Sequence, residues 1–269
     1  QTIDPLHVVD GIGDVLGCLR DDGPVRRKRS GILDAGGGDS TYLQYDRRNA
    51  DSGVEWLAAH RDDDKPWALM LSFVCPHPPY ICPPEWFDYY AERDLPLPPQ
   101  WRQGDWPAHP VIDHFRRFFD FHPQFEEPQI RRLLAAYYGA CSFLDEQIGR
   151  VLTQLEALGL TQSTRVIYSS DHGEHLGGRG IFGKFSLYDE SAAVPMIAAG
   201  PDVPQGAVCR TPTSLVDLYP SIIESVGAES HNDDAGLPGR SLWTIASNPD
   251  AQRTVLSEYH AVGSQQASY

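Results

Sequence analysis

The sequence predicts an α/β fold, in which helices cover a mostly parallel sheet. Apolar runs at residues 67–74 and 166–168 each end in polar residues, which is typical of strands buried within a sheet. In segment 128–158, apolar residues recur every three or four positions, and this spacing predicts a long amphipathic helix. We expect this helix to pack on the sheet beside the second of these strands.

Composition limits the classes of protein that fit. With 269 residues and 41% hydrophobic content, the chain is long enough for one large α/β domain, or for one domain and a fragment. The net charge of −15 makes nucleic acid and anionic membranes unsuitable partners. No apolar run has the length of a membrane span, and the first residues show no signal peptide. Five cysteines form no disulfide pattern, so we expect reduced thiols and a cytoplasmic protein.

The N-terminal part is expected to be irregular up to residue 49, because it is rich in glycine and aspartate. Within it, the three glycines Gly36–Gly38 predict a flexible connection. The first expected helix covers residues 51–60, and either Asp51 or Ser52 is expected to cap it.

Residues 81–127 are rich in proline, tryptophan and phenylalanine. They predict a short helix at 85–91 and then a long extended loop, since the proline-rich stretch 95–99 forbids regular structure. Loops of this length often wall a substrate pocket. Three tryptophans are candidates for such a wall, although ordinary packing is the favoured role for each: Trp86, Trp101 and Trp106.

Two more elements follow the strand at 166–168. Residues 194–199 predict another strand, and Pro195 fits only near its start. Residues 214–226 have helical spacing, and Pro220 is expected to start or kink a turn there.

The strand at 166–168 leads to the most informative residues of the chain. It is followed by Asp171, His172 and Gly173, so a carboxylate and an imidazole leave the strand together, at the end where ligands bind in open α/β sheets. Carboxylate oxygen and neutral imidazole nitrogen suit a divalent metal ion. Lys184 follows a glycine-rich loop, and a lysine returned towards a metal holds an anionic substrate oxygen. Taken alone, Asp-His-Gly is most often a turn with a solvated carboxylate.

A histidine also follows the first apolar run. His77 lies between Pro76 and Pro78, just past residues 67–74. One interpretation is a rigid loop that carries a surface histidine. The other is a histidine that faces the same crevice as Asp171.

The pattern around the motif resembles the second metal-binding segment of the sulfatase family, within the alkaline-phosphatase superfamily. Residues 165–195 combine the strand, Asp-His-Gly-Glu, Leu-Gly, Gly-Lys, Tyr-Asp-Glu-Ser and Val-Pro in the family's order. The resemblance is greatest to the branch of choline-sulfatase-like enzymes and phosphonate monoester hydrolases. Residues 72–80 are similar to the family's Ser-Phe, Pro-His, Pro-Pro-Tyr stretch, and residues 237–242 are similar to its Gly-x-Ser-Leu loop. On this resemblance we favour a functional His77.

This resemblance implies an alkaline-phosphatase-like, three-layer α/β/α fold with a central, mostly parallel sheet. Residues 1–245 are then the catalytic domain without its N-terminal part. Residues 246–269 are the beginning of a small C-terminal α+β subdomain, and residues 254–259 are its first strand.

The resemblance also implies roles for individual residues. Asp171 and His172 are expected to bind the metal, and His77 and Lys184 are expected to be catalytic and substrate-binding residues. The metal is expected to be Ca²⁺, with Mn²⁺ as the alternative. Two ligands alone make a weak site, because such ions take about six.

A further residue is left with two interpretations. Where relatives often have Asp-His-Gly, this chain has Gly-Arg-Gly at 178–180. Arg179 is either an added substrate-binding contact for the anion or a solvent-exposed side chain. We favour the solvent-exposed interpretation slightly.

The activity that the resemblance implies is hydrolysis of sulfate esters by a formylglycine nucleophile. The alternative is hydrolysis of phosphonate or phosphate mono- or diesters by the same fold, and a third interpretation is a non-catalytic remnant. The expected partner is a small anionic ester, without nucleic acid or membrane, and a homo-oligomer is left open.

The sequence departs from the family pattern at its N-terminal side. Sulfatases carry a C/S-x-P-x-R motif for the nucleophile and an upstream aspartate pair that completes the metal site, and neither is found here. Cys82 precedes prolines but lacks the arginine and follows His77, so we reject it as the nucleophile. The resemblance covers about residues 45–269. We therefore expect the nucleophile upstream of Gln1, and we expect this fragment alone to be inactive.

Overall fold

The computed structural model describes residues 29–122, 124–184 and 186–258. In chain order its elements are α2 Arg29–Leu33, β1 Gly36–Gly37, α3 Thr41–Ala59, β2 Ile81–Cys82, α4 Pro84–Ala91, η1 Gln103–Asp105, α5 Pro110–Phe118, α6 Glu127–Ala157, β3 Val166–Ser169, η2 Gly178–Gly180, α7 Asp189–Ala192, β4 Met196–Ala199, η3 Leu215–Asp217, α8 Leu218–Val226, η4 Asn232–Gly236 and α9 Leu242–Ser247. None of the helices in these ranges combines the length and the apolar character that a membrane span needs.

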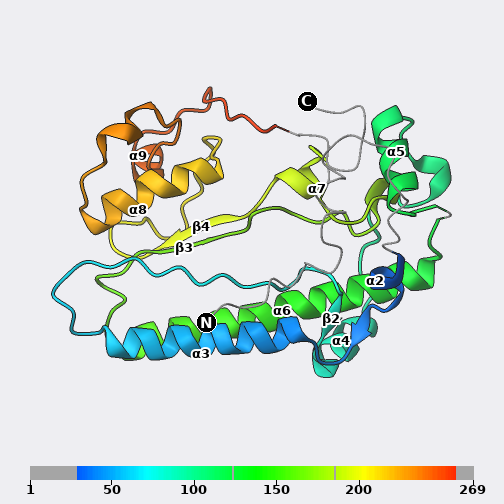
Figure 1. The fold of residues 1–269 in the computed structure, drawn as a ribbon, viewed down its shortest axis with the longest axis horizontal. Helices are drawn as coiled ribbons and strands as arrows, with labels where there is room; N and C mark the ends of the chain where they lie inside the picture. The colour runs from blue at the N-terminus through cyan, green and yellow to red at the C-terminus, as the bar shows by residue number, and fades with distance from the viewer. Residues whose placement is uncertain (1–28, 123, 185, 259–269) are drawn as a thin grey trace.

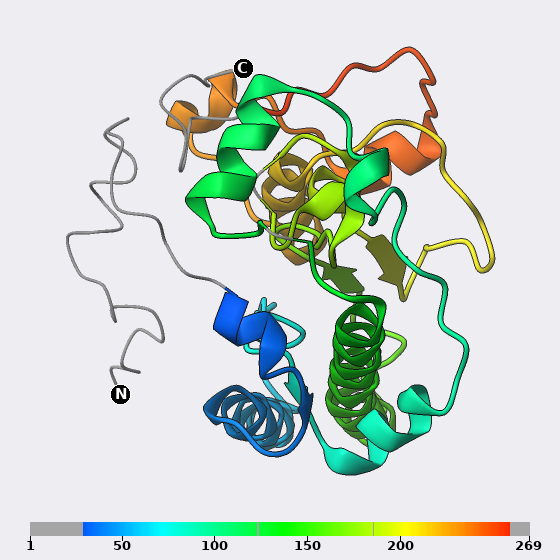
Figure 2. The ribbon, with the colours of Figure 1, turned by 90° about the vertical axis from the view of Figure 1, so that its right-hand side faces the viewer.

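These elements are arranged in three layers (Figure 1). Helices α3 and α6 pack against each other and form one outer layer, which the turned view shows end-on (Figure 2). Strands β3 and β4 and the extended chain after α3 lie in the middle, and α8 and α9 cover the opposite side. The order of the layers is the α/β/α order that the sequence predicts.

Helix α6 organises the first layer and confirms the helix expected at 128–158, with a shift of one residue. Glu126 caps its N-terminus, and Gln129 Oε1 accepts the Glu126 N–H in return at 2.7 Å. One face of the helix is buried against α3 and α4. Each large aliphatic side chain buried there stabilises the fold by about 1.5–3 kcal/mol. The buried residues are Ile130, Leu133, Leu134, Ala135, Ala136, Gly139, Ala140, Phe143, Leu144, Gln147 and Leu155.

Helix α3 begins ten residues before the helix expected at 51–60, so the prediction of an irregular chain up to residue 49 is wrong where the structure describes it. The cap is Ser40, whose side-chain oxygen accepts the Leu43 N–H at 3.2 Å. Many charged side chains on this helix conceal its apolar period. Gly53 allows close packing, since a Cβ there would lie 2.6 Å from a methyl of Leu71.

The three glycines after α2 do not form a flexible connection. Gly36 and Gly37 form β1, which pairs in parallel with β2. A Cβ at Gly36 would lie 2.4 Å from the guanidinium of Arg132, so a side chain there would displace the end of this arginine. Arg132 in turn donates from Nε to the Ala35 carbonyl, at 2.5 Å, and ties this strand to α6.

Residues 81–127 are less irregular than expected. Helix α4 confirms the prediction at 85–91, but α5 was not expected within the proline-rich stretch. Helix α5 starts at Pro110, a position where proline is tolerated because its missing N–H would be unpaired anyway. Trp101 is buried and Trp106 donates to its carbonyl at 3.1 Å, so both serve packing. This region contributes Ile112, Phe115, Phe119, Phe121 and Phe125 to the main apolar core.

Strands β3 and β4 confirm the strands expected near 166–168 and 194–199, and Pro195 directly precedes β4. The two strands are antiparallel to each other, with Val166 opposite Ala199. They are not fully buried, because Tyr168 is 36% exposed and Ile197 is 60% exposed. The described sheet is therefore small and only partly covered.

Residues 67–74 are extended, but they form no strand, so this prediction is wrong. Their side chains alternate between partly buried and exposed, and Met70 is 85% exposed. A strand needs a neighbour for its ladder of hydrogen bonds, and the part of the chain that the structure describes provides none for this segment. The apolar run indicates the extended conformation correctly, but not the pairing.

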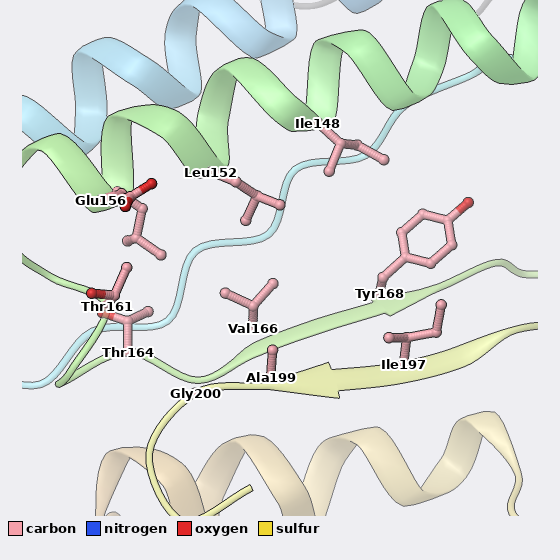
Figure 3. A pocket seen from close by; sticks show the side chains of 11 residues that line it. Ile148, Leu152, Glu156, Thr161, Thr164, Val166, Tyr168, Ile197, Ala199 and Gly200 are labelled. Carbon is pink, nitrogen blue, oxygen red and sulfur yellow. The ribbon is translucent and has the colours of Figure 1, made fainter. Parts of the chain in front are cut away.

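An apolar hollow of about 390 Å³ separates one end of α6 from the β3–β4 pair (Figure 3). Leu152 and Ile148 reach into it from the helix, and Val166 and Tyr168 face them from β3. Helix and sheet are thus not in close contact at this end. The other lining residues are Leu155, Glu156, Thr161, Thr164, Ile197, Ala199 and Gly200.

Helix α8, preceded by η3, confirms the helix expected at 214–226, and Pro220 lies in its first turn. The strand expected at 254–259 is not formed over residues 254–258, where Leu256 is 78% exposed. The described chain offers this segment no partner strand. Residue 259 lies outside the described residues, and the separate C-terminal subdomain stays a prediction.

Asp217 holds the third layer together. Its side chain is fully buried and accepts from both terminal nitrogens of Arg253, at 2.8 and 2.7 Å. It also accepts the backbone N–H groups of Ser214 and Arg240, each at 2.8 Å. Burial alone would raise the pKa of Asp217, but Arg253 and these two N–H groups lower it below its ordinary value of 3.8.

We expect Asp217→Ala to lower the free energy of unfolding by about 3–5 kcal/mol, because it leaves Arg253 buried without its carboxylate. Chemical denaturation measures this change. The control is Asp94→Ala, which removes an exposed carboxylate that also pairs with an arginine. The stabilisation should be present above pH 4 and should fade as the pH drops below it, since the folded-state pKa is lowered. Equal effects of the two substitutions would contradict this role.

Candidate functional site

Four residues singled out in the sequence lie together at one end of β3. His77 Nε2 is 2.8 Å from Lys184 Nζ, and the rings of His77 and His172 are 6.4 Å apart. Asp171 is adjacent to His172 and contributes to the electrostatic environment of Lys184. Three separate segments of the chain therefore supply one cluster of two imidazoles, a carboxylate and an ammonium group.

The first segment is the turn that follows β3. His172 Nδ1 lies 2.9 Å from the Gly173 carbonyl. A carbonyl only accepts, so Nδ1 carries a proton, and in the neutral ring Nε2 then holds the lone pair. Nε2 lies 3.6 Å from Asp171 Oδ2, and Ser170 Oγ donates to the His172 carbonyl at 2.9 Å. A nitrogen lone pair and a carboxylate oxygen thus face the same space.

Gly173 is required for close approach rather than for a special turn, because its φ is not positive. A Cβ on Gly173 would lie 2.2 Å from the carbonyl oxygen of Glu190. The Gly173 N–H donates to the Ser191 carbonyl at 2.8 Å. The turn with Asp171 and His172 is therefore fixed against α7.

The second segment is the loop that carries His77. Asp46 of α3 is fully buried and accepts the N–H groups of Val74 and Cys75, each at 2.8 Å. This carboxylate anchors the loop immediately before His77. His77 Nδ1 lies 2.7 Å from the Pro78 carbonyl, so Nδ1 carries the proton and Nε2 accepts from Lys184.

The third segment carries Lys184. Glu174 Oε1 accepts the Leu176 N–H at 2.9 Å and the Gly183 N–H at 2.7 Å. Glu174 thus ties the end of the Asp171 turn to the residue before Lys184. The Ser191 hydroxyl donates to the Lys184 carbonyl and fixes the same stretch from α7.

Burial lowers the pKa of Lys184 below its ordinary value of 10.5, while the carboxylates of Glu174 and Asp171 oppose this change. The ammonium group donates to a neutral imidazole, and it is partly removed from water. A cation in such a position is well suited to bind an anionic oxygen. It is also a proton donor with a pKa closer to neutrality than that of a solvated lysine.

Two donors do not complete a metal site. Asp171 and His172 have the chemistry that a divalent ion needs, and their donor atoms face one another. In the three ranges that the structure describes, no other histidine, cysteine, aspartate or glutamate lies where it could be a third ligand beside these two. The donor chemistry of the pair suits a divalent ion, but the described residues do not form a complete site.

Arg179 does not lie free in solvent, so the favoured interpretation of this residue is wrong. Its side chain is 17% exposed, pairs with Glu190 at 2.7 Å and lies over the ring of Tyr188 at 4.2 Å. Its backbone has a φ of +54°, and its carbonyl accepts from Nε and Nη2 of Arg116, at 2.9 and 2.6 Å. A substrate contact by Arg179 stays a prediction.

Sequence reasoning missed the residues that hold this cluster. Asp46 lies far from His77 in sequence, and no local pattern marks a buried carboxylate within a charged helix. The sequence could have indicated Glu174, because this residue directly follows Asp-His-Gly in the motif. Ser191 lies in the Tyr-Asp-Glu-Ser stretch, whose side chains gave no sign of their contacts.

Cys82 is unsuitable as a nucleophile, as the sequence indicates. It is fully buried in β2, against Gly139 of α6. Burial, with the nearby carboxylates of Glu85 and Asp88, raises its pKa to about 12. Cys18 lies outside the described residues.

Comparisons with known proteins show which family this chain resembles. The family model named Sulfatase matches residues 21–228. The choline-sulfatase of Rhizobium meliloti is 30% identical over 77% of this chain and 41% of its own length. The arylsulfatase K of Mus musculus is 30% identical over 84% of this chain and 44% of its own length. This chain thus spans less than half of either relative.

A solved structure extends the likeness to the fold. The phosphonate monoester hydrolase from Silicibacter pomeroyi is 28% identical, with a TM-score of 0.65, over 78% of this chain and 43% of its own. This supports the predicted α/β architecture, although the sheet described here is small. Since the family model covers well over half of the residues, this chain belongs to the sulfatase family.

Proposed function

We propose that the protein hydrolyses sulfate esters, and that His77, Lys184, Asp171 and His172 are part of its active site. The observation that carries the proposal is the Lys184–His77 contact of 2.8 Å beside a turn that presents two metal-ligand side chains. Family membership and two sulfatase relatives support it. Because the chain spans less than half of those relatives, the activity is proposed for the complete protein.

Lys184 is assigned to the oxygens of the ester. A sulfate ester carries negative charge on its non-bridging oxygens, and this charge must be held while the ester is attacked. The Lys184 ammonium group is positioned by hydrogen bonds on both sides of the residue and is partly buried, which strengthens its attraction for an anion. Its contact with His77 uses one N–H of the ammonium group and leaves two others to donate.

The hydrogen bonds at His77 indicate how a proton reaches the leaving oxygen. Nε2 of His77 accepts from Lys184, so neutral His77 has no proton there to give. Lys184 is the group that donates, and His77 takes up a proton only when Lys184 passes one on. The departing alkoxide thus takes its proton from the Lys184 ammonium group, which becomes a neutral amine, while His77 holds Lys184 through Nε2.

A divalent metal is assigned to Asp171 and His172. Oxygen and imidazole ligands suit Ca²⁺, and Mn²⁺ is the alternative. When bound, the ion supplies positive charge at the attacked centre. The chain's own contribution is a neutral imidazole with its Nε2 lone pair directed beside Asp171. The remaining ligands and the expected formylglycine belong to residues outside the described site.

A second candidate function is hydrolysis of phosphonate or phosphate esters. The specific observation in its favour is the likeness to a phosphonate monoester hydrolase structure. The same cations bind either anion, so Lys184 does not discriminate between them. The net charge of −15 supports a small anionic ester, rather than nucleic acid, as the partner. The cytoplasmic location stays a prediction.

In the complete protein, Lys184→Met should lower kcat/KM for an aryl sulfate by about 10²–10³-fold, as expected when one contact to a developing anion is lost. Lys65→Met is the control, because Lys65 is exposed.

The activity of the unsubstituted protein should also fall as the pH is raised, with a midpoint below pH 10.5, since burial lowers the pKa of Lys184 and the protonated form is needed. A Lys184→Met protein with full activity would remove Lys184 from the site. A higher kcat/KM for the matching phosphonate would favour the second function.

His77→Ala should slow an alkyl sulfate by about 10²-fold or more, because its poor leaving group needs a proton. An activated aryl sulfate should be slowed much less. Steady-state kinetics on the two substrates give this ratio, with His231→Ala as the control because His231 is 75% exposed. Equal losses on both substrates would argue for a role of His77 in binding alone.

Asp171→Ala should reduce both the calcium content and the turnover of the complete protein, because it removes one of the two paired donors. Elemental analysis after gel filtration measures the bound ion. Asp233→Ala is the control, since Asp233 is a carboxylate with 90% exposure, close to the 84% of Asp171. Unchanged metal content in Asp171→Ala would exclude this residue as a ligand.

A further inference from the structure

His175 is a buried histidine that the proposed chemistry does not use. Its side chain is 2% exposed, and its ring lies edge-on to Tyr188, with centroids 5.9 Å apart. Nε2 is 2.8 Å from Ser186 Oγ. Nδ1 is buried and has no hydrogen-bond partner among the residues that the structure describes. A buried ring nitrogen without a partner destabilises the fold, and an apolar side chain of similar size would avoid this.

Two of the hydrogen bonds of His175 lie on either side of Lys184. Its backbone N–H donates to the Gly183 carbonyl at 3.1 Å. Its ring bonds to Ser186, whose own N–H donates to the Lys184 carbonyl at 2.8 Å. The Ser186 hydroxyl oxygen also accepts the Tyr188 N–H at 3.2 Å. The turn that carries Lys184 is thus held at the residue before it and at the second residue after it.

The ring must stay neutral in this environment. Burial lowers the pKa of His175 to about 4, with Glu190 opposing and Arg179 adding to the change. Ser186 Oγ accepts from Tyr188, and it exchanges one further hydrogen bond with Nε2. In either tautomer Nδ1 stays unpaired within the described chain, so the ring makes one hydrogen bond there, to Ser186, two residues after Lys184.

We propose that His175 is a positioning residue for Lys184. Its bonds to Gly183 and Ser186 hold the chain on both sides of Lys184 in the arrangement that brings Lys184 Nζ to His77 Nε2. The importance of this position for turnover rests on the role proposed for Lys184, but the positioning itself does not. A side chain that served packing alone would not need a nitrogen at Nε2.

The test measures Lys184 in this chain directly, without turnover. Amine labelling with acetic anhydride, followed by mass spectrometry of the Lys184 peptide over a range of pH, gives the midpoint at which the ammonium group loses its proton. In the unsubstituted chain this midpoint should lie below 10.5. In His175→Leu it should rise towards 10.5, because a loosened turn exposes the amine to water. The midpoint of thermal unfolding should be unchanged or higher, since the unpaired nitrogen is gone.

Two further variants make the result decisive. His175→Gln keeps a side-chain N–H for Ser186 and should retain the low labelling midpoint. Ser186→Ala removes the same bond from the other side and should reproduce the rise, and it replaces His175→Leu if that variant does not fold. An unchanged midpoint in the folded bond-deficient variant would overturn the proposal, and so would a rise in His175→Gln equal to that in His175→Leu. Absence of sulfatase activity in the complete protein would count against the proposed function only, because labelling does not depend on turnover.

Discussion

The hydrogen bond from the Gly183 amide to the Glu174 carboxylate is the contact on which the arrangement of the site depends. Glu174 directly follows the turn with Asp171 and His172, and Gly183 directly precedes Lys184. The bond, at 2.7 Å, therefore joins the proposed metal-binding segment to the cation by a single side chain. A charged acceptor strengthens such a bond roughly twofold relative to a neutral one. The backbone bond from the His175 N–H to the Gly183 carbonyl, at 3.1 Å, joins the same two segments beside it.

The same device recurs at two other places in the chain. Asp46 accepts two consecutive amides just before His77, and Asp217 accepts two amides from separate segments of the third layer. In each case a single carboxylate pairs with backbone donors that no helix or strand satisfies. Since unpaired buried donors are costly, such carboxylates define where irregular segments must lie. These hydrogen bonds tie each irregular segment to the element that carries the carboxylate.

Local signals in the sequence account for much of the fold and the site. The spacing of apolar residues located α6 to within one residue, and the apolar run with Asp-His-Gly placed the end of β3. For residues 67–74, composition indicates an extended chain, but strand pairing depends on a neighbouring strand that the run itself does not specify. Asp46 and Glu174 were missed because their partners are defined only by the folded chain. The start of α3 was missed because Ser40, a good cap, precedes a helix without a clear apolar stripe.

Arg116 has a consequence for how the substrate range of such a protein is changed. It is 1% exposed, stacks on Trp106 and holds the Arg179 carbonyl with two nitrogens. The proline-rich stretch and α5 are therefore not an independent appendage, but a module whose shape is transmitted to the loop between the two halves of the site motif. A chimaera that receives this stretch from a relative should receive it as one unit. The unit should include Arg116 and the residue at position 179, whose carbonyl Arg116 binds. Exchange of a shorter piece would separate the buried Arg116 guanidinium from the carbonyl at position 179. This would destabilise the recipient protein instead of changing its substrate range.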